Sequence, residues 1–342
     1  MKITKALTFR ASSIGDCLMA KYLLDNVHAE FPEARLGIVI ASRGGMIRDL
    51  LANAPYIEVI ETNRRDIRGL FRLWRHFHGS ELVVTQYAGK HGGRFGMASK
   101  LAARVLARRG GLVGFKDASR WNTFLYDHLL PVRPDHAVAE HEREALRAAG
   151  LSVLVPYPQL RVTAQPAVLE RFSLQSGRYI VAHFFAGNAG RSISPQKARE
   201  LIEHLRARFP ETTIVLSGGA ADQATTQTML DGVSNSVTVA GSASLQDMLQ
   251  LINSSIGVVS VDTGIAHITA QIGRPLVVMR TCLGPNWWFP EQYGARAAQQ
   301  FTREDLCTPH VSKNYPDCID KIDMRAVADA CKNSFVQRTS VR

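Results

Sequence analysis

The stretch IGVVSVDTGIAHITAQIGRPLVVM, residues 256–279, contains two short apolar runs joined by a helical pattern. Gly257–Val261 and Leu276–Met279 predict buried strands, and Ala266–Ile272 predicts the helix between them. A strand, a helix and a second strand in this order are typical of parallel strands in one sheet. The stretch therefore predicts an α/β fold.

The same alternation extends through both halves of the chain. Leu151–Pro166, which contains three prolines, predicts a linker between them. The sequence therefore predicts two doubly wound domains, which bind ligands beyond the carboxyl ends of their strands. Further strands are predicted at Ile3–Phe9, Leu36–Ile40, Leu82–Gln86, Tyr179–Phe184, Thr213–Ser217 and Ser236–Ala240. Helices are predicted at Cys17–Glu30, Met46–Ala54, Arg65–His76, His141–Ala149, Lys197–Arg208, Ala221–Leu230, Leu245–Ile252 and Met324–Phe335.

Composition places the 342-residue chain among globular proteins, with 46% hydrophobic and 21% charged residues. No run approaches 18 apolar residues and the first residues lack an apolar signal segment, so we expect a cytoplasmic protein. The five cysteines form no CxxC pair and no zinc-type spacing. We therefore expect reduced thiols and no metal site.

Positive charge is concentrated in the first half. The net charge is +11, of which residues 1–150 carry +8, and residues 61–120 hold 13 Lys and Arg against 4 Asp and Glu. Such a surface favours an anionic partner: nucleic acid, phosphorylated lipid or a membrane. No nucleic-acid recognition motif accompanies the charge, so nucleic acid is not expected.

Three turns rich in small residues follow predicted strands of the second half: HFFAGNAGRS (183–192), LSGGAADQ (216–223) and DTGIAHITA (262–270). The last turn leads into a helix, whose first N–H groups can bind phosphate oxygens. No P-loop or GxGxxG pattern is present. Taken singly, Gly218–Gly219 is explained by a turn, Asp262 by a helix cap and His267 by core packing. Their shared place at one sheet edge favours a ligand site.

A fourth turn, RASSIGDCLMA (10–20), follows the first predicted strand and contains Asp16. Ser12 or Ser13 can cap a helix that begins near Ile14, and Asp16 in its first turn complements the helix dipole. These residues alone leave open whether Asp16 is only part of a cap or a carboxylate that faces a ligand.

Three of these motifs together resemble the bacterial heptosyltransferases, glycosyltransferase family nine. DTGIAHITAQIGRP is similar to the family's D-[ST]-G-x-x-H signature, RASSIGD to its N-terminal R-x-S-S-x-G-D motif, and LSGGAADQ to its G-G-x-x-[ED] turn. The resemblance implies a GT-B fold with two Rossmann-like domains facing a cleft. It places an acceptor domain at 1–165, a donor domain at 166–322, and a final helix at 323–342 that packs back on the first domain.

The resemblance also implies an inverting transfer of heptose from ADP-heptose to the Kdo or heptose residues of the lipopolysaccharide inner core. Asp16 is then the general base that takes the proton of the acceptor hydroxyl, with Ser12 and Ser13 beside the acceptor. The implied donor site consists of Arg191, Gly218, Gly219, Asp222, Asp262, Thr263, Gly264 and His267. Helix amides and Arg191 would stabilise the leaving diphosphate, so no metal or other cofactor is expected.

The sequence departs from the family pattern at two positions. Ile193 stands where an aromatic residue is usual, in a Lys-x-Trp pattern that here reads Arg-Ser-Ile, and Ile265 stands where proline is common. These departures leave open another nucleotide sugar or a protein acceptor, and a catalytically silent nucleotide-sugar or lipid-binding protein is the alternative outside the enzyme class.

Arginines at 64, 68, 72 and 75 recur at helical spacing in the basic first half. They form either a solvated helix face or a contact with anionic lipid A or Kdo phosphates. With the resemblance, Arg64, Arg68 and Arg72 are predicted to bind the acceptor. The protein is then expected to lie on the cytoplasmic face of the inner membrane as a peripheral protein.

Overall fold

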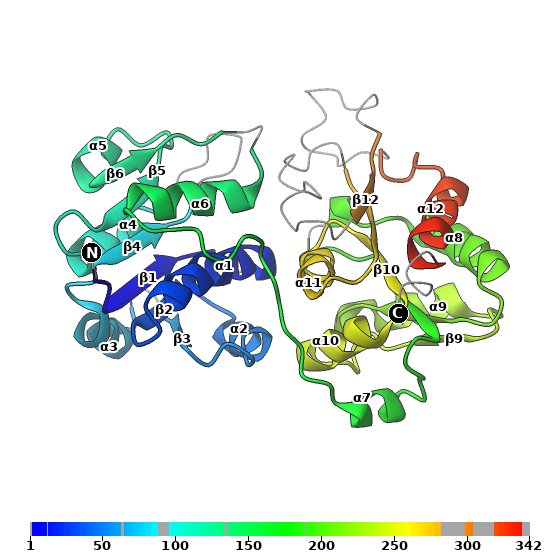
Figure 1. Ribbon diagram of the computed structural model, residues 1–342. Coiled ribbons are helices and arrows are strands. Elements are labelled where there is room, and N and C mark those ends of the chain that lie inside the picture. The colour runs from blue at the N-terminus through cyan, green and yellow to red at the C-terminus, as the bar shows by residue number, and fades with distance from the viewer. Residues whose placement is uncertain are drawn as a thin grey trace. The chain divides into compact units, whose positions relative to one another are not determined.

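Two parallel six-stranded sheets, each covered by helices on both faces, organise the chain (Figure 1). The computed structural model describes residues 2–11, 13–62, 65–87, 96–133, 136–187, 189–281, 298–303 and 318–336. The chain divides into a first unit, Met1–Pro158, and a second unit that begins at Gln159, so the division lies inside the predicted linker. The two sheets confirm the predicted α/β class.

The sheet of the first unit has the strand order β3-β2-β1-β4-β5-β6, and every neighbouring pair is parallel. This order places β1 and β4 at the centre, where the direction of winding reverses. The strands are β1 (Lys5–Phe9), β2 (Arg35–Ile40), β3 (Ile57–Glu61), β4 (Leu82–Thr85), β5 (Leu112–Phe115) and β6 (His128–Leu130). The helices are α1 (Ile14–Glu30), α2 (Gly44–Leu50), α3 (Ile67–Phe77), α4 (Met97–Leu106), α5 (Asn122–Leu125) and α6 (Val138–Ala148).

Helices form a layer on each face of this sheet. On one face α1 lies between α2 and α6 and contacts both. On the other face, Leu73 and Phe77 of α3 share one apolar cluster with Ala103 and Leu106 of α4, and α5 contacts α4. The α3, α4 and α5 helices thus form the second layer.

The second sheet has the order β12-β11-β10-β7-β8-β9, again parallel throughout. Its strands are β7 (Tyr179–His183), β8 (Thr213–Ser217), β9 (Ser236–Thr238), β10 (Gly257–Val261), β11 (Leu276–Met279) and β12 (Ala298–Phe301). Its helices are α7 (Pro166–Arg171), α8 (Pro195–Arg208), α9 (Gln223–Leu230), α10 (Leu245–Ser254), α11 (Gly264–Ile272) and α12 (Met324–Val336). The β10–α11–β11 segment is the strand–helix–strand unit predicted from residues 256–279.

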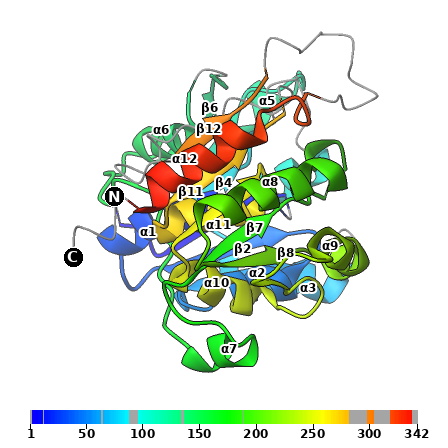
Figure 2. The same cartoon turned by 90° about the vertical axis from the view of Figure 1, so that its right-hand side faces the viewer.

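The last helix, α12, belongs to the second unit and lies beside α8 there (Figure 2). The expected packing of this helix on the first domain stays a prediction. Its buried face, including Val327, Cys331 and Phe335, belongs to the core cluster that contains β7, β8 and α8. Phe335 packs on β10 where Gly257 has no side chain, since a Cβ there would overlap the ring. This apolar face fixes the helix to its own sheet.

Three further features bear on the expectations. Among the described residues, no helix combines the length and apolarity needed to cross a membrane. Cys17 and Cys331 are buried free thiols. Cys282 and Cys307 lie outside the described residues.

Candidate functional site

Asp16 stands in the first turn of α1, beyond the carboxyl end of β1. The helix cap is Ser13, whose Oγ accepts a hydrogen bond from Asp16 N at 3.2 Å and donates one to Asp16 Oδ2 at 2.6 Å. Within the described part of the chain, Oδ1 of the same carboxylate has no hydrogen-bond partner. Asp16 is half-buried, so this oxygen is available to an incoming hydroxyl group.

A buried ion pair lies close to Asp16. Arg10 Nη2 donates to Glu142 Oε2 at 2.7 Å, and the two side chains are 1% and 0% exposed. Arg10 follows β1 and Glu142 belongs to α6, so the pair joins the central strand to that helix. Burial raises the pKa of Glu142, and the negative charge of Asp16 acts in the same direction while Arg10 opposes both. Arg10 is therefore paired with Glu142, and the negative charge of Asp16 acts on both groups.

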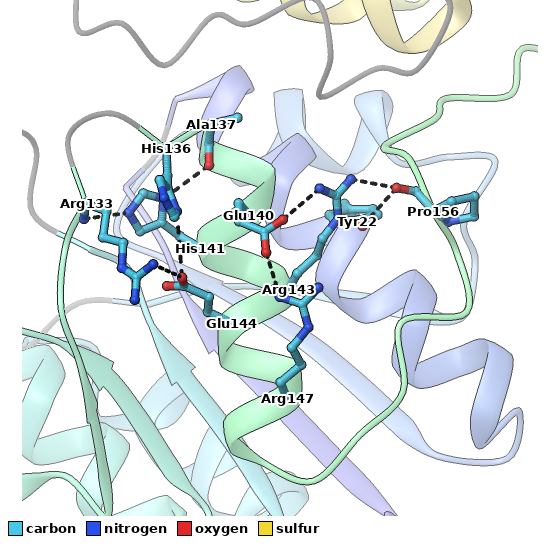
Figure 3. Close-up of polar contacts among 10 residues, drawn as sticks. All are labelled: Tyr22, Arg133, His136, Ala137, Glu140, His141, Arg143, Glu144, Arg147 and Pro156. Carbon is cyan, nitrogen blue, oxygen red and sulfur yellow. Dashed lines mark hydrogen bonds and ion pairs between the residues drawn. The ribbon is translucent and has the colours of Figure 1, made fainter.

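Aromatic rings and histidines line the neighbouring strand ends. Tyr87, two residues after β4, packs against Phe115 of β5 and against His141 of α6, with ring centroids 5.6 Å and 5.2 Å apart. His141 Nε2 accepts a hydrogen bond from Arg133 N at 3.1 Å, so Nδ1 is the atom that donates to Ala137 O (Figure 3). Burial lowers the pKa of His141, which keeps this ring neutral near pH 7.

The α6 helix is tied to α1, the helix that carries Asp16. Arg143 Nε donates to the Tyr22 hydroxyl at 2.9 Å and its Nη2 donates to Pro156 O at 2.6 Å (Figure 3). Glu140 accepts from Arg143 on the same helix at 2.9 Å. These bonds fix the position of α6, the helix that carries Glu142 and His141.

The other predicted acceptor residues are only partly placed. Ser12 and Arg64 lie outside the described residues. Arg68 and Arg72 are exposed on α3, where Asp66 caps the helix by accepting from Gly69 N at 2.9 Å. Acidic residues lie near these arginines. Arg72 lines a cavity of about 440 Å³ together with Glu58, Glu61 and Asp66.

In the second unit, the turn after β8 is organised by Asp222. Its Oδ2 accepts from Gly219 N at 2.8 Å, and a Cβ at Gly218 would press on the Asp222 side chain. His183, at the end of β7, contacts Ser217 Oγ through Nδ1 at 3.0 Å. Burial lowers the pKa of His183 to about 4. Gly218, Gly219 and Asp222 therefore lie together in one turn, where the Asp222 carboxylate has a structural partner in Gly219 N.

The turn from β10 into α11 forms the other part of this edge. Asp262 is buried directly after β10, and Thr263 is the residue that precedes α11 in extended conformation. Gly264 begins the helix, whose first N–H groups have no intrahelical partners. Burial, followed by the positive charge of Arg191, lowers the pKa of His267 to about 3. The positive charge of Arg191 thus acts on His267, and burial keeps His267 neutral.

The residues that depart from the family pattern both have core positions. Ile193 is 3% exposed and belongs to the apolar cluster beneath the sheet, and Ile265 is 7% exposed. Neither presents a surface on which a ligand ring could stack.

Sequence reasoning missed Arg10, Glu142, Tyr87 and His141 as site residues. Arg10 was visible in the quoted N-terminal motif, and Tyr87 follows a predicted strand. Glu142 and His141 gave no such signal, because a charged helix is ordinarily a solvated one. The contact between Arg10 and Glu142 joins positions 132 residues apart.

Two doubly wound units with ligand-type turns at their strand ends define a GT-B type of fold. Solved structures with this fold are similar over nearly the whole chain. ADP-heptose lps heptosyltransferase II of E. coli is 19% identical, with 98% of this chain and 100% of that one covered and a TM-score of 0.75. E. coli heptosyltransferase WaaC with ADP-2-deoxy-2-fluoro heptose is 17% identical, with coverages of 98% and 100% and a TM-score of 0.68.

A third similar structure is the dodecameric iron-containing heptosyltransferase TibC of E. coli in complex with ADP-D-beta-D-heptose. It is 12% identical, with 99% of this chain and 77% of that one covered and a TM-score of 0.55. No curated protein sequence is a significant match. The family model Glycosyltransferase family 9 (heptosyltransferase) matches residues 100–304. The chain belongs to this family, and is a glycosyltransferase.

Proposed function

We propose that the protein transfers heptose from ADP-heptose to an inner-core sugar, Kdo or heptose, of a lipopolysaccharide precursor, with inversion at the anomeric carbon. Family membership supports the heptosyl transfer. The single observation that carries the mechanism is the Asp16 carboxylate at a strand end, with one oxygen held by Ser13 and the other without a partner in the described chain.

In the proposed reaction, Asp16 accepts the proton of the acceptor hydroxyl as its oxygen attacks the anomeric carbon. The new carbon–oxygen bond forms on the face opposite the departing diphosphate, whose own carbon–oxygen bond breaks with both electrons going to ADP. Arg10 provides a fixed positive charge next to the carboxylate that receives the proton. Ser13 fixes the orientation of that carboxylate.

The second unit is proposed to hold the donor. The first N–H groups of α11, with the helix dipole behind them, would stabilise the negative charge on the leaving ADP, and the Arg191 guanidinium would share it. Asp222, at the glycine turn, is the proposed partner of the ribose hydroxyls, and neutral His267 would hydrogen-bond near the sugar–phosphate end. Asp262, Thr263 and Gly264 form the turn that carries these amides.

We propose that the reaction needs no metal. Iron is named for TibC alone among the three structures. In the described ranges of this chain no three His, Cys, Asp or Glu side chains are grouped to hold a metal ion. Arg68 and Arg72 are proposed to bind acceptor phosphates, and the protein is proposed to work at the cytoplasmic face of the inner membrane.

The test is transfer by the purified protein from ADP-heptose to Kdo2-lipid A and to a heptosylated core acceptor, followed by mass spectrometry. We expect a mass increase of one heptose in one of these, insensitive to EDTA. We expect Asp16→Asn to bind ADP normally but to lower kcat by roughly 100-fold or more, as for the loss of a general base. Ser13→Ala tests the orientation of the base separately, because it removes the hydroxyl that bonds Asp16 Oδ2 and leaves the carboxylate.

Three results would count against the proposal. Transfer that occurs only from a different nucleotide sugar would show that ADP-heptose is not the donor. Normal turnover by Asp16→Asn would make Asp16 no more than a helix residue. ADP binding without transfer to any acceptor would favour a silent binding protein.

A further inference from the structure

Large apolar side chains are exposed mainly on one helical layer. Of the eleven that are exposed in the described chain, eight belong to the layer formed by α3, α4 and α5. They are Ile67 (78% exposed), Phe71 (62%), Trp74 (46%), Met97 (38%), Leu101 (51%), Val105 (61%), Trp121 (53%) and Phe124 (82%). We call this set the outer apolar surface.

The spacing of these side chains shows that they form outward stripes. On α3, positions 67, 71 and 74 share one side of the helix, while Leu73 and Phe77 face the core. On α4, positions 97, 101 and 105 form the outer stripe, and Ala103 and Leu106 face the core. Each stripe is separate from the positions that face the core, and a layer with this many exposed apolar side chains favours a second apolar environment besides its own core.

The stripes belong to one layer. The α3 and α4 helices cover the same face of the sheet, and α5 contacts α4. Aromatic rings lie next to one another on it, with ring centroids 6.1 Å apart for Phe71 and Trp74 and 6.4 Å apart for Trp121 and Phe124. Exposed apolar area gathered on one layer in this way marks protein or membrane contacts.

Basic side chains border the outer apolar surface. Arg68, Arg72 and Arg75 are exposed on α3, about 100° around the helix from the apolar stripe. Within the described residues, none of the three forms an ion pair. Next to α5, the Arg120 guanidinium lies 5.7 Å from the centre of the Trp121 ring. Exposed aromatic and aliphatic side chains with cations beside them match the headgroup level of an anionic bilayer.

We propose that the outer apolar surface binds the protein to an anionic lipid bilayer, with its aromatic side chains among the headgroups and the bordering arginines on lipid phosphates. A second copy of the chain is a poorer fit, because a two-fold contact would bring the same arginines together. The biological use of this contact rests on the proposed function, since it would hold the enzyme on the membrane that carries its acceptor.

The test is vesicle flotation of the full chain with vesicles of equal parts phosphatidylethanolamine and phosphatidylglycerol, and with phosphatidylcholine vesicles. We expect binding to the anionic vesicles only, weakened by salt. The variant Phe71→Ser/Trp74→Ser/Phe124→Ser should lower the partition coefficient by roughly tenfold or more, since three rings lose their lipid contact. Its matched control is Leu154→Ser/Tyr157→Ser, which removes two exposed apolar side chains outside the layer and should bind like the wild type.

Unchanged melting temperatures establish that both variants are folded, and transfer to a short soluble acceptor, measured in parallel, tests the proposed function separately. Absence of wild-type binding, or equal binding by wild type and the triple variant, overturns the membrane proposal whatever the transfer assay gives. A wild-type dimer that the triple variant dissociates in sedimentation also overturns it and assigns the surface to a second copy.

Discussion

Arg10 and Glu142 form a buried salt bridge. Its effect on stability and its effect on catalysis can be separated by mutation. Removing one partner leaves an uncompensated buried charge, so Glu142→Leu should destabilise the protein by roughly 3–5 kcal/mol. The double variant Arg10→Met/Glu142→Leu removes both charges and should recover most of that loss. If the charge of Arg10 assists Asp16 in catalysis, the kcat of the double variant should stay at least roughly tenfold below the wild-type value. This corresponds to about 1.4 kcal/mol in the activation free energy.

Urea unfolding and steady-state kinetics of the single and double variants measure the two effects. Lys21 and Asp25, a pair at 2.7 Å further along α1, supply a control of the same chemistry. Their double replacement by Met and Leu should leave kcat near normal. Recovery of both stability and kcat in the Arg10/Glu142 double variant would show that the pair has no part in the reaction.

His183 and His267 make stability depend on pH. Their pKa values in the folded protein are about 4 and about 3, below the ordinary 6.5, because burial disfavours the charged ring. The unfolded chain therefore binds more protons between these values and 6.5. Their contribution to stability is complete above about pH 6.5 and is lost as pH falls toward 4.

Melting temperatures measured from pH 7.5 to 4.5 check this. The wild type should lose stability on acidification, and His183→Gln and His267→Gln should each lose less over the same interval. His204→Gln, which makes the same replacement on α8 of the same unit, serves as the control. Parallel curves for all four proteins would contradict the prediction.

How far the site could be predicted depends on the distance between its residues in sequence. Asp16, the glycine turn and the start of α11 could be named as candidates because each lies in a short segment directly after a strand, where backbone geometry is local. The Arg10–Glu142 pair could not be predicted, because packing of α6 against α1 decides it. Ile193 shows a further limit. The sequence shows that this residue departs from the family pattern, but it does not show that the side chain lies in the core.

The same distinction separates the elements. The strands at 213–217, 257–261 and 276–279 were predicted to the residue, because each is a short, mainly apolar run between turn residues. The strands β3, β5 and β6 and the helix α4 were not predicted. β6 has only three residues and β5 includes Gly114. On α4 the exposed outer stripe blurs the apolar–polar alternation by which helices are recognised.

The position of α12 yields a prediction about packing. Because a Cβ at Gly257 would overlap the Phe335 ring, Gly257→Ala should displace α12 from β10 and destabilise the protein by about 1–3 kcal/mol. Gly45→Ala is the control, since a Cβ there meets nothing within 4 Å. Combining Gly257→Ala with Phe335→Leu should restore part of the loss.

Chemical unfolding of the three variants gives the comparison. A Gly257→Ala protein as stable as the Gly45→Ala protein would mean that α12 is not held against β10.

We propose that the first unit binds the acceptor and the second unit binds the donor. The binding of ADP tests which unit holds the nucleotide. ADP binds only the folded state, so it slows amide exchange wherever opening destroys its site. We expect protection at the strand ends of β7, β8 and β10 and in the first turn of α11. At 100 times its Kd, ADP should slow those amides by roughly 100-fold. The amides of β1, α1 and α6 should be unaffected.

Hydrogen-exchange mass spectrometry of the full chain measures both sets of amides in one experiment. Arg191→Ala should weaken ADP binding and reduce the protection, because the guanidinium next to His267 is lost. Arg178→Ala makes the same change of charge at the start of β7, on the opposite edge of that sheet, and should leave protection intact. Protection confined to α1 and α6 would place the nucleotide in the first unit and reverse the proposed roles of the two cores.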